Sequence, residues 1–188
     1  MSAPQPMEPA TTIAPWHAAY PAPRNTELLS VTREEVLAML EAQREGQGSC
    51  KKRDFLLVDL RRVDHEVRHI SPFLNLSTPF GPGNIDTHPQ GGTIRGSINL
   101  PAQSLYPAIT TLYSVLKAAG VRKVIWYCSS SRGRGPRAAG WFSDYLSDQS
   151  DGDMQSLVLV NGIKGWATAG PAYSEWMDEY DEAVWAKK

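Results

Sequence analysis

Residues 124–137 read VIWYCSSSRGRGPR, and the interpretation of the whole chain starts from this stretch. The stretch is typical of a short apolar strand, then a cysteine, a loop of small residues and the start of a helix. The loop from Ser129 to Arg134 contains no proline, so all its backbone N–H groups are available to point inward. Pro136 suits the first helical turn because it has no N–H that would lack a partner. The sequence therefore predicts N–H donors gathered at a positive helix end, which is an anion-binding arrangement.

Cys128 is the residue that this arrangement would surround. A thiol among such donors and several arginines favours the thiolate form near neutral pH. The alternative is that a lone cysteine at the end of a strand is a small buried apolar residue. A structural core does not need Arg132, Arg134 and Arg137 around one thiol. We therefore expect Cys128 to be a nucleophile and the loop to be its oxyanion cradle.

Composition restricts the class of protein. A chain of 188 residues with 41% hydrophobic residues is sufficient for one domain with its own core. The net charge of -1 gives no general attraction to nucleic acid or to acidic membranes, and no apolar run approaches the length of a membrane span. Cys50 and Cys128 do not make a disulfide framework, and the first residues do not resemble a secretory signal. These features predict a cytoplasmic location, or also a nuclear one. No paired Cys or His spacing indicates a metal site.

The order of elements predicts the fold class. Residues 1–28 are rich in proline and alanine and are expected to form a flexible arm, which Trp16 and Tyr20 are suited to hold onto the domain. The rest, 29–188, is expected to be one domain whose first helix begins at a capping box over 32–35. Strands are predicted at 54–61, 97–100, 121–127 and 156–160, and later helices at 105–119, 136–147 and 172–186. This alternation predicts an α/β fold with a central parallel sheet of about five strands and helices on both faces. Sites in such sheets lie at the carboxyl ends of strands.

Four motifs occur in an order that resembles rhodanese-like domains. They are VDLR at 58–61, GGTIRGSINLP at 91–101, the loop after Cys128, and VNGIKGW at 160–166. The match covers roughly residues 30–175. The Cys-x5-Arg spacing from Cys128 to Arg134 is similar to that of the rhodanese-fold phosphatases that activate cyclin-dependent kinases and of the yeast-type arsenate reductases. Sulfur-transferring rhodaneses typically have a loop that is one residue shorter. Overall the chain is most similar to small single-domain fungal rhodanese-like proteins.

The resemblance implies a Cys-dependent enzyme that acts on an oxyanion, either as a phosphatase or as an arsenate reductase. Cys128 would attack phosphorus or arsenic, and Arg134 would bind two oxygens of the anion in a fork. The residues implied to form the anion-binding loop are Ser129, Ser130, Ser131, Arg132 and Gly133. The substrate would be a phosphorylated protein or a small oxyanion. We expect no cofactor, with water, glutathione or glutaredoxin completing the reaction. Two alternatives stay open: a sulfurtransferase that carries sulfane sulfur on Cys128, and a non-catalytic module that binds a partner.

Three positions depart from the family pattern. Tyr127 stands where these enzymes usually have histidine, so the loop itself must stabilise the thiolate. Gly133 stands where the phosphatases have glutamate, so no general acid is visible in the loop. Leu60 stands where the same phosphatases have a second cysteine. We expect Asp59 and Arg61 to form a structural pair that orients the loop, although Asp59 is also a candidate for the missing acid.

Residues 67–90 interrupt the family pattern, in which an acidic residue runs almost directly into the Gly91-Gly92 motif. The segment has four prolines and no sustained periodicity, so it is expected to be a surface loop without catalytic residues. One interpretation is a lid or a partner-docking loop. The other is a retained intron, because codons for Val67 and Gln90 can supply intron borders. Sequencing the transcript decides this, since a spliced message would join Glu66 to Gly91.

Overall fold

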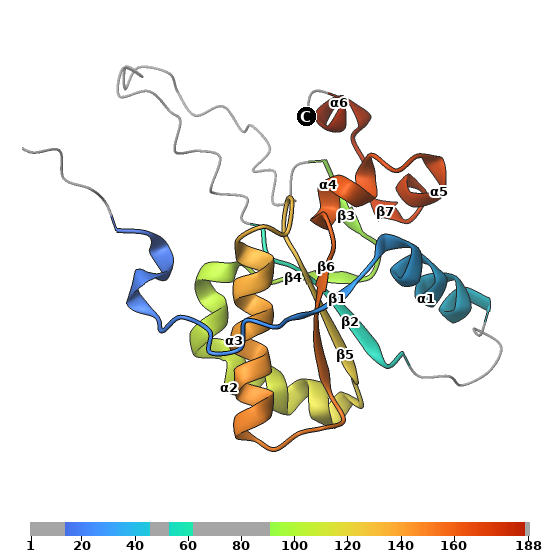
Figure 1. The fold of residues 1–188 in the computed structure, drawn as a ribbon. Helices are drawn as coiled ribbons and strands as arrows, with labels where there is room; N and C mark the ends of the chain where they lie inside the picture. The colour runs from blue at the N-terminus through green and yellow to red at the C-terminus, as the bar shows by residue number, and fades with distance from the viewer. Residues whose placement is uncertain (1–13, 46–52, 62–90, 187–188) are drawn as a thin grey trace, which may run out of the picture.

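The computed structural model describes residues 14–45, 53–61 and 91–186. Its centre is a five-stranded sheet in the order β1-β6-β5-β2-β4, in which every neighbouring pair is parallel (Figure 1). The strands are β1 (Leu29–Val31), β2 (Phe55–Asp59), β4 (Ser97–Asn99), β5 (Lys123–Tyr127) and β6 (Gln155–Leu159). The predicted α/β class with a parallel five-stranded sheet is therefore confirmed. The 67–90 segment and Cys50 lie outside the described residues.

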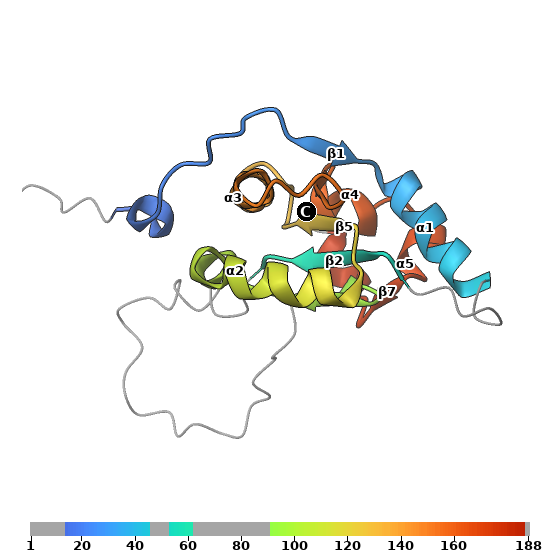
Figure 2. The same cartoon turned by 90° about the horizontal axis from the view of Figure 1, so that it is seen from below.

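Helices cover both faces of this sheet, as predicted. Figure 2 shows α2 (Ala102–Ala119) and α3 (Arg134–Asp148) on one side, and α1 (Arg33–Glu45) and the C-terminal elements on the other. Each face has its own apolar core: α2 and α3 pack on one, and α1 and α4 (Gly162–Ala167) pack on the other. Burial of these two sets of apolar side chains is the main stabilising contribution to the fold.

Local sequence signals set the ends of two helices. Thr32 and Glu35 form the predicted capping box, in which Thr32 N donates to Glu35 Oε2 over 2.8 Å and Glu35 N donates to Thr32 Oγ1 over 3.2 Å. Gly120 ends α2 in the left-handed region at φ 76°. The helix α2 begins at Ala102, directly after Pro101, rather than at residue 105. None of the helices within the described ranges has both the length and the apolar character needed to cross a membrane.

The predicted helix at 172–186 is wrong. The structure instead has α5 (Pro171–Ser174), a strand β7 (Met177–Asp178) and α6 (Glu182–Trp185). Met177 pairs with Ile94 in an antiparallel ladder between β7 and β3 (Thr93–Ile94), and this pairing requires extended backbone. Glu179 then takes a positive φ of 57°, which interrupts any continuing helix. Met177 and Trp185 of this segment belong to the same apolar core as Ile94.

The described part of the arm lies against the α2–α3 face. A short 3₁₀ helix η1 (Trp16–Ala19) places Trp16 edge-on to Trp141, with ring centroids 6.1 Å apart, and Tyr20 also lies edge-on to Trp141 at 5.9 Å. The indole N–H of Trp141 donates to Pro21 O over 2.8 Å. The prediction that Trp16 and Tyr20 hold this segment on the domain is confirmed.

Candidate active site

The loop predicted to carry the chemistry joins the carboxyl end of β5 to the first residue of α3. Cys128 follows β5 directly, and Arg134 begins α3, so the two residues stand at the two ends of the loop. Arg134 Nη2 donates to Ser129 Oγ over 3.4 Å, which closes the loop on itself. Cys128 is buried, with 3% of its surface exposed, whereas Ser129, Arg132 and Gly133 are exposed. Cys128 therefore packs in the apolar core beneath α2 and α3, and the loop that follows it has residues exposed to solvent.

The first turn of α4 fixes the outward direction of the loop carbonyls. Ile163 N donates to Cys128 O over 3.0 Å, and Lys164 N donates to Ser129 O over 2.9 Å. By contrast, the backbone N–H groups of residues 129–134 form no hydrogen bond with any group in the part of the chain that the structure describes. Consecutive amides without an acceptor are costly unless water or an anion binds them. The loop thus has the bonding pattern of an anion cradle.

Glycines make room for this arrangement. Gly162 has φ 55°, and a Cβ there would lie 2.3 Å from Cys128 O and 2.9 Å from Ser131 Oγ. A Cβ on Gly135 would lie 3.1 Å from Ser131 Oγ. Sequence reasoning did not assign these two glycines to the site. The Asn161-Gly162 pair after a strand was the available signal, because both of its residues adopt positive φ.

Ser131 is unusual in two respects. Its φ of 51° is in the left-handed region, which is rare for a residue with a side chain. Its hydroxyl is buried between Gly135 and Gly162 and has no hydrogen-bond partner among the described residues. Both features cost stability, and such costs concentrate at functional sites. The side chain fits a space that only two glycines leave open, so it fixes the turn in the middle of the loop.

Asp59 and Arg61 form an ion pair next to the loop. Arg61 Nε donates to Asp59 Oδ1 over 2.9 Å and Arg61 Nη2 donates to Oδ2 over 2.6 Å, while Thr93 Oγ1 also donates to Oδ2 over 3.0 Å. The expected pairing is therefore present. Leu60 N, between the two, donates to Tyr127 O over 2.9 Å and so ties the end of β2 to the residue before Cys128. Asp59 has no exposed surface, which argues against it as a general acid for substrate. Its role in orienting the loop stays a prediction.

Tyr127 does not take the place of the usual histidine. Its ring belongs to the core beneath α1 and α4, whereas Cys128 belongs to the core beneath α2 and α3. The Tyr127 hydroxyl lies 2.7 Å from Thr93 Oγ1 and donates to Ser97 Oγ over 2.9 Å. Burial, with a smaller effect of the Asp59 charge, raises the pKa of Tyr127 far above its ordinary value. Tyr127 is therefore a neutral structural donor.

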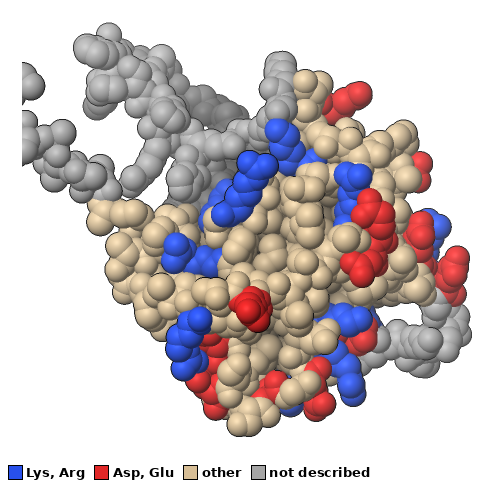
Figure 3. Space-filling view, viewed as in Figure 1, with Lys and Arg blue, Asp and Glu red and all other residues tan. Residues whose placement is uncertain are grey.

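Basic side chains lie near the exposed residues of the loop, which are Ser129, Arg132 and Gly133. Figure 3 shows Lys and Arg side chains over the end of β5 and the start of α3. Arg132 is exposed, and the guanidinium of half-buried Arg137 lies 5.9 Å from the centre of the Trp141 ring. Among the described residues, no group of three or more His, Cys, Asp or Glu side chains is placed to hold a metal ion. The charge near these exposed residues favours an anionic substrate.

Comparison with known proteins identifies the fold. No family model matches the chain. The chain is 26% identical over 127 residues to arsenical-resistance protein 2 of Saccharomyces cerevisiae, covering 67% of this chain and 84% of that protein. It is 41% identical over 49 residues to arsenate reductase 2.1 of Oryza sativa subsp. japonica, covering 25% of this chain and 31% of that protein. Ygr203w, described as a yeast protein tyrosine phosphatase of the rhodanese family, superposes with a TM-score of 0.54 at 19% identity, over 86% of this chain and 99% of that chain.

The fold is therefore rhodanese-like. The resemblance to small single-domain fungal rhodanese-like proteins is confirmed by the two yeast proteins, one matched in sequence and the other in fold.

Proposed function

We propose that this protein is a Cys-dependent enzyme that reduces arsenate with a thiol co-substrate. One observation carries the proposal. In the loop from Cys128 to Arg134, the amides of residues 129–134 have no acceptor within the described residues, while α4 binds the carbonyls of Cys128 and Ser129. A tetrahedral oxyanion presents several oxygens, and these could accept from the loop amides and from the fork of the Arg134 guanidinium. The names of the yeast and rice relatives support arsenate as that oxyanion.

The first step is a condensation on Cys128. Its sulfur attacks arsenic in dihydrogen arsenate, so that an S–As bond forms and an As–O bond breaks. With Cys128 as the thiolate, one hydroxyl of dihydrogen arsenate takes the proton of the other and leaves as water, and arsenic keeps its oxidation state. Arg134 and the loop amides stabilise the negative charge that spreads over the remaining oxygens.

The second step is the reduction. Glutathione sulfur attacks the Cys128 sulfur, so that an S–S bond forms and the S–As bond breaks. The bonding pair stays on arsenic, which leaves as arsenite, and the thiol proton completes the product. A second glutathione, or glutaredoxin, then reduces the mixed disulfide and restores the Cys128 thiol. The thiol supplies both electrons, so no further reductant is needed.

Among the residues that the structure describes, no general acid lies at the loop, and this favours arsenate reduction over hydrolysis of a phosphate ester. An ester releases an alkoxide or phenoxide that needs a positioned proton donor. Gly133 carries no side chain, and Asp59 is buried and bound to Arg61 and Thr93. An arsenate hydroxyl leaves as water with the proton of the second arsenate hydroxyl, so no protein acid is required. A cytoplasmic location would supply the reduced glutathione that the reaction consumes.

A three-substrate assay on the purified full-length protein tests the proposal. The protein is offered arsenate with glutathione, p-nitrophenyl phosphate, and thiosulfate with cyanide. We expect arsenate-dependent formation of oxidised glutathione, which Cys128→Ser abolishes. Turnover of p-nitrophenyl phosphate alone would replace the proposal with a phosphatase. Turnover of thiosulfate alone would replace it with a sulfurtransferase, which the longer loop does not favour.

A further inference from the structure

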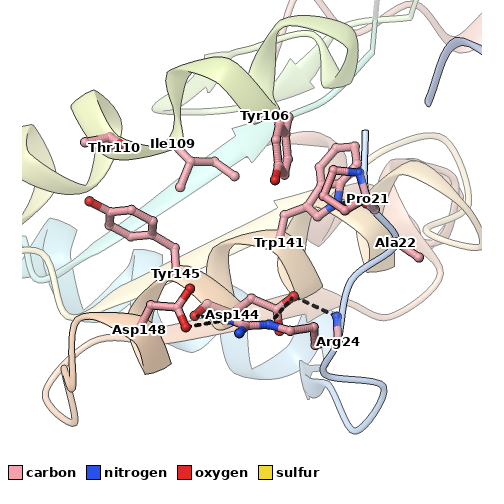
Figure 4. Close-up of a pocket in the computed structure, with 10 residues that line it drawn as sticks. All are labelled: Pro21, Ala22, Arg24, Tyr106, Ile109, Thr110, Trp141, Asp144, Tyr145 and Asp148. Carbon is pink, nitrogen blue, oxygen red and sulfur yellow. Dashed lines mark hydrogen bonds and ion pairs between the residues drawn. The ribbon is translucent and has the colours of Figure 1, made fainter. Parts of the chain in front are cut away.

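A second candidate site lies on the outer face of α2 and α3, away from the loop. A pocket of about 270 Å³ opens between these helices and arm residues 21–24. Figure 4 shows its aromatic walls, formed by Tyr106, Trp141 and Tyr145, with Asp144 and Asp148 on one side. Asp144 is ten residues beyond Arg134 on α3, which places the pocket roughly 15 Å along the helix axis from the loop.

The charged groups at this pocket are two carboxylates and one guanidinium. Arg24 Nη2 donates to Asp148 Oδ1 over 2.6 Å, and the backbone N–H of Arg24 donates to Asp144 Oδ2 over 2.7 Å. Asn25 N donates to the other Asp144 oxygen over 2.9 Å. The Asp144 side chain is 15% exposed and each of its oxygens accepts one backbone N–H, whereas the Asp148 side chain is 56% exposed and is open to a further donor. The lining is net negative, and its carboxylates already hold one guanidinium.

The rest of the lining suits the same kind of ligand. The hydroxyl of Tyr106 is directed into the pocket in Figure 4, and it forms no hydrogen bond within the described part of the chain. Ile109 and Tyr145 supply apolar surface beside it. Aromatic faces attract cations, and a cation between such faces and a carboxylate gains from both. Anions are disfavoured there because Asp144 and Asp148 outnumber Arg24.

We infer that this pocket binds a small organic cation: a primary ammonium on a short apolar or aromatic body. The ammonium would donate to Asp148 and to the Tyr106 hydroxyl, and the body would lie over Ile109 and Tyr145. Pro21, Ala22 and Arg24 form one wall, so the ligand would also contact the arm. The same ammonium chemistry is found in a free amine and in a lysine side chain of a protein.

Titration of the full-length protein with phenethylammonium, followed by ¹H–¹⁵N NMR, tests the inference. We expect shifts of the Trp141 indole N–H, which is bonded to Pro21 O, and of the amides of residues 144–148. Neutral 2-phenylethanol and anionic phenylacetate are expected to bind at least tenfold more weakly, because they lack the charge-assisted bond. N-acetyl-lysine amide represents a lysine side chain of a protein. If it binds more tightly than phenethylammonium, the ligand of the pocket is a lysine side chain rather than a free amine.

Variants of the lining residues distinguish a pocket that binds cations through Asp148 from one that binds any small apolar compound. Asp148→Asn is expected to weaken phenethylammonium binding about tenfold, and Asp153→Asn, which removes an exposed carboxylate outside the pocket, to leave it unchanged. Tyr106→Phe is a second variant that keeps the ring and removes the hydroxyl. Arsenate turnover is expected to be unchanged in Asp148→Asn, so this test is independent of the proposed enzyme function. Equal binding of the three phenyl compounds, or no binding at millimolar concentration, would overturn the inference.

Discussion

The backbone N–H of Ile163 donates to the carbonyl oxygen of Cys128 over 3.0 Å, which joins the start of α4 to the candidate nucleophile. The next amide, that of Lys164, binds Ser129 O in the same way. An element that follows β6 therefore holds the backbone of a loop that follows β5. The shape of the cradle depends on this contact between two strand ends.

Gly162→Ala is predicted to damage the cradle more than the fold. A Cβ at this position would lie 2.3 Å from Cys128 O, and the φ of 55° disfavours any side chain. We expect kcat/KM for arsenate to fall at least tenfold and the free energy of unfolding to fall by about 1–3 kcal/mol. Steady-state kinetics and urea denaturation measure the two effects. Gly152→Ala, where a Cβ meets nothing within 4 Å, is the matched control. Wild-type kinetics in Gly162→Ala would contradict the α4 contact as a determinant of the site.

Arg134 and Arg132 are predicted to have different roles although they are two residues apart. Arg134→Ala removes the fork at the end of the loop and should lower kcat/KM by about 10²-fold. Arg132 is exposed, so Arg132→Ala should lower kcat/KM less than tenfold, through weaker attraction of the anion. Kinetics at low and high ionic strength distinguish the two, because salt screens only the exposed charge effectively. An equal loss at both salt concentrations in Arg132→Ala would assign that residue to the cradle.

Ser131→Ala is predicted not to destabilise the protein. The Ser131 hydroxyl is buried without a partner among the described residues, so its removal relieves a desolvation cost. The free energy of unfolding should stay the same or rise by about 1 kcal/mol. Ser131→Val should lower it, since the larger β-branched side chain must fit between Gly135 and Gly162. Urea denaturation of both variants checks this, and a clear loss of stability in Ser131→Ala would mean that the hydroxyl has an unseen partner.

Asp151 is predicted to contribute to acid stability. Its hydrogen bond from Lys117, together with those from the Asp153 backbone and Tyr113, lowers the pKa of Asp151 to about 2. Because the folded pKa is below the unfolded value of about 4, the contribution is complete above pH 4 and is lost as the pH falls toward 2. Asp151→Asn should reduce the free energy of unfolding at neutral pH by about 1 kcal/mol and flatten its decline between those pH values. Denaturation from pH 2 to pH 7 measures both, and an unchanged acid slope would refute the assignment.

Local signals in the sequence were sufficient for strands β2, β4, β5 and β6 and for the three long helices α1, α2 and α3. The Thr32–Glu35 capping box, the Gly120 helix end and the run after Cys128 each involve neighbouring residues, and the structure has the predicted form at all three. Strand β1 (Leu29–Val31) was not predicted, because three residues carry no periodicity and form a strand only by pairing with β6. The helix predicted at 172–186 is wrong for the same reason, since β7 forms only through its pairing with β3.

The candidate site also has features that local sequence predicts and features that it does not. The spacing between Cys128 and Arg134 is a property of one loop and is readable from the sequence. The contact of Gly162 with that loop and the complete burial of Asp59 depend on how separate strands end together. Sequence patterns do not determine such distances.

The side chains of Tyr127 and Cys128 lie on opposite faces of the sheet, so substitutions at these two adjacent positions should have different effects. Substitutions at Tyr127 are predicted to change the hydrogen-bonded interior shared with Thr93 and Ser97, whereas substitutions at Cys128 are predicted to change reactivity. In a library that varies both positions, the ranking of variants by thermal stability should therefore be nearly uncorrelated with their ranking by turnover.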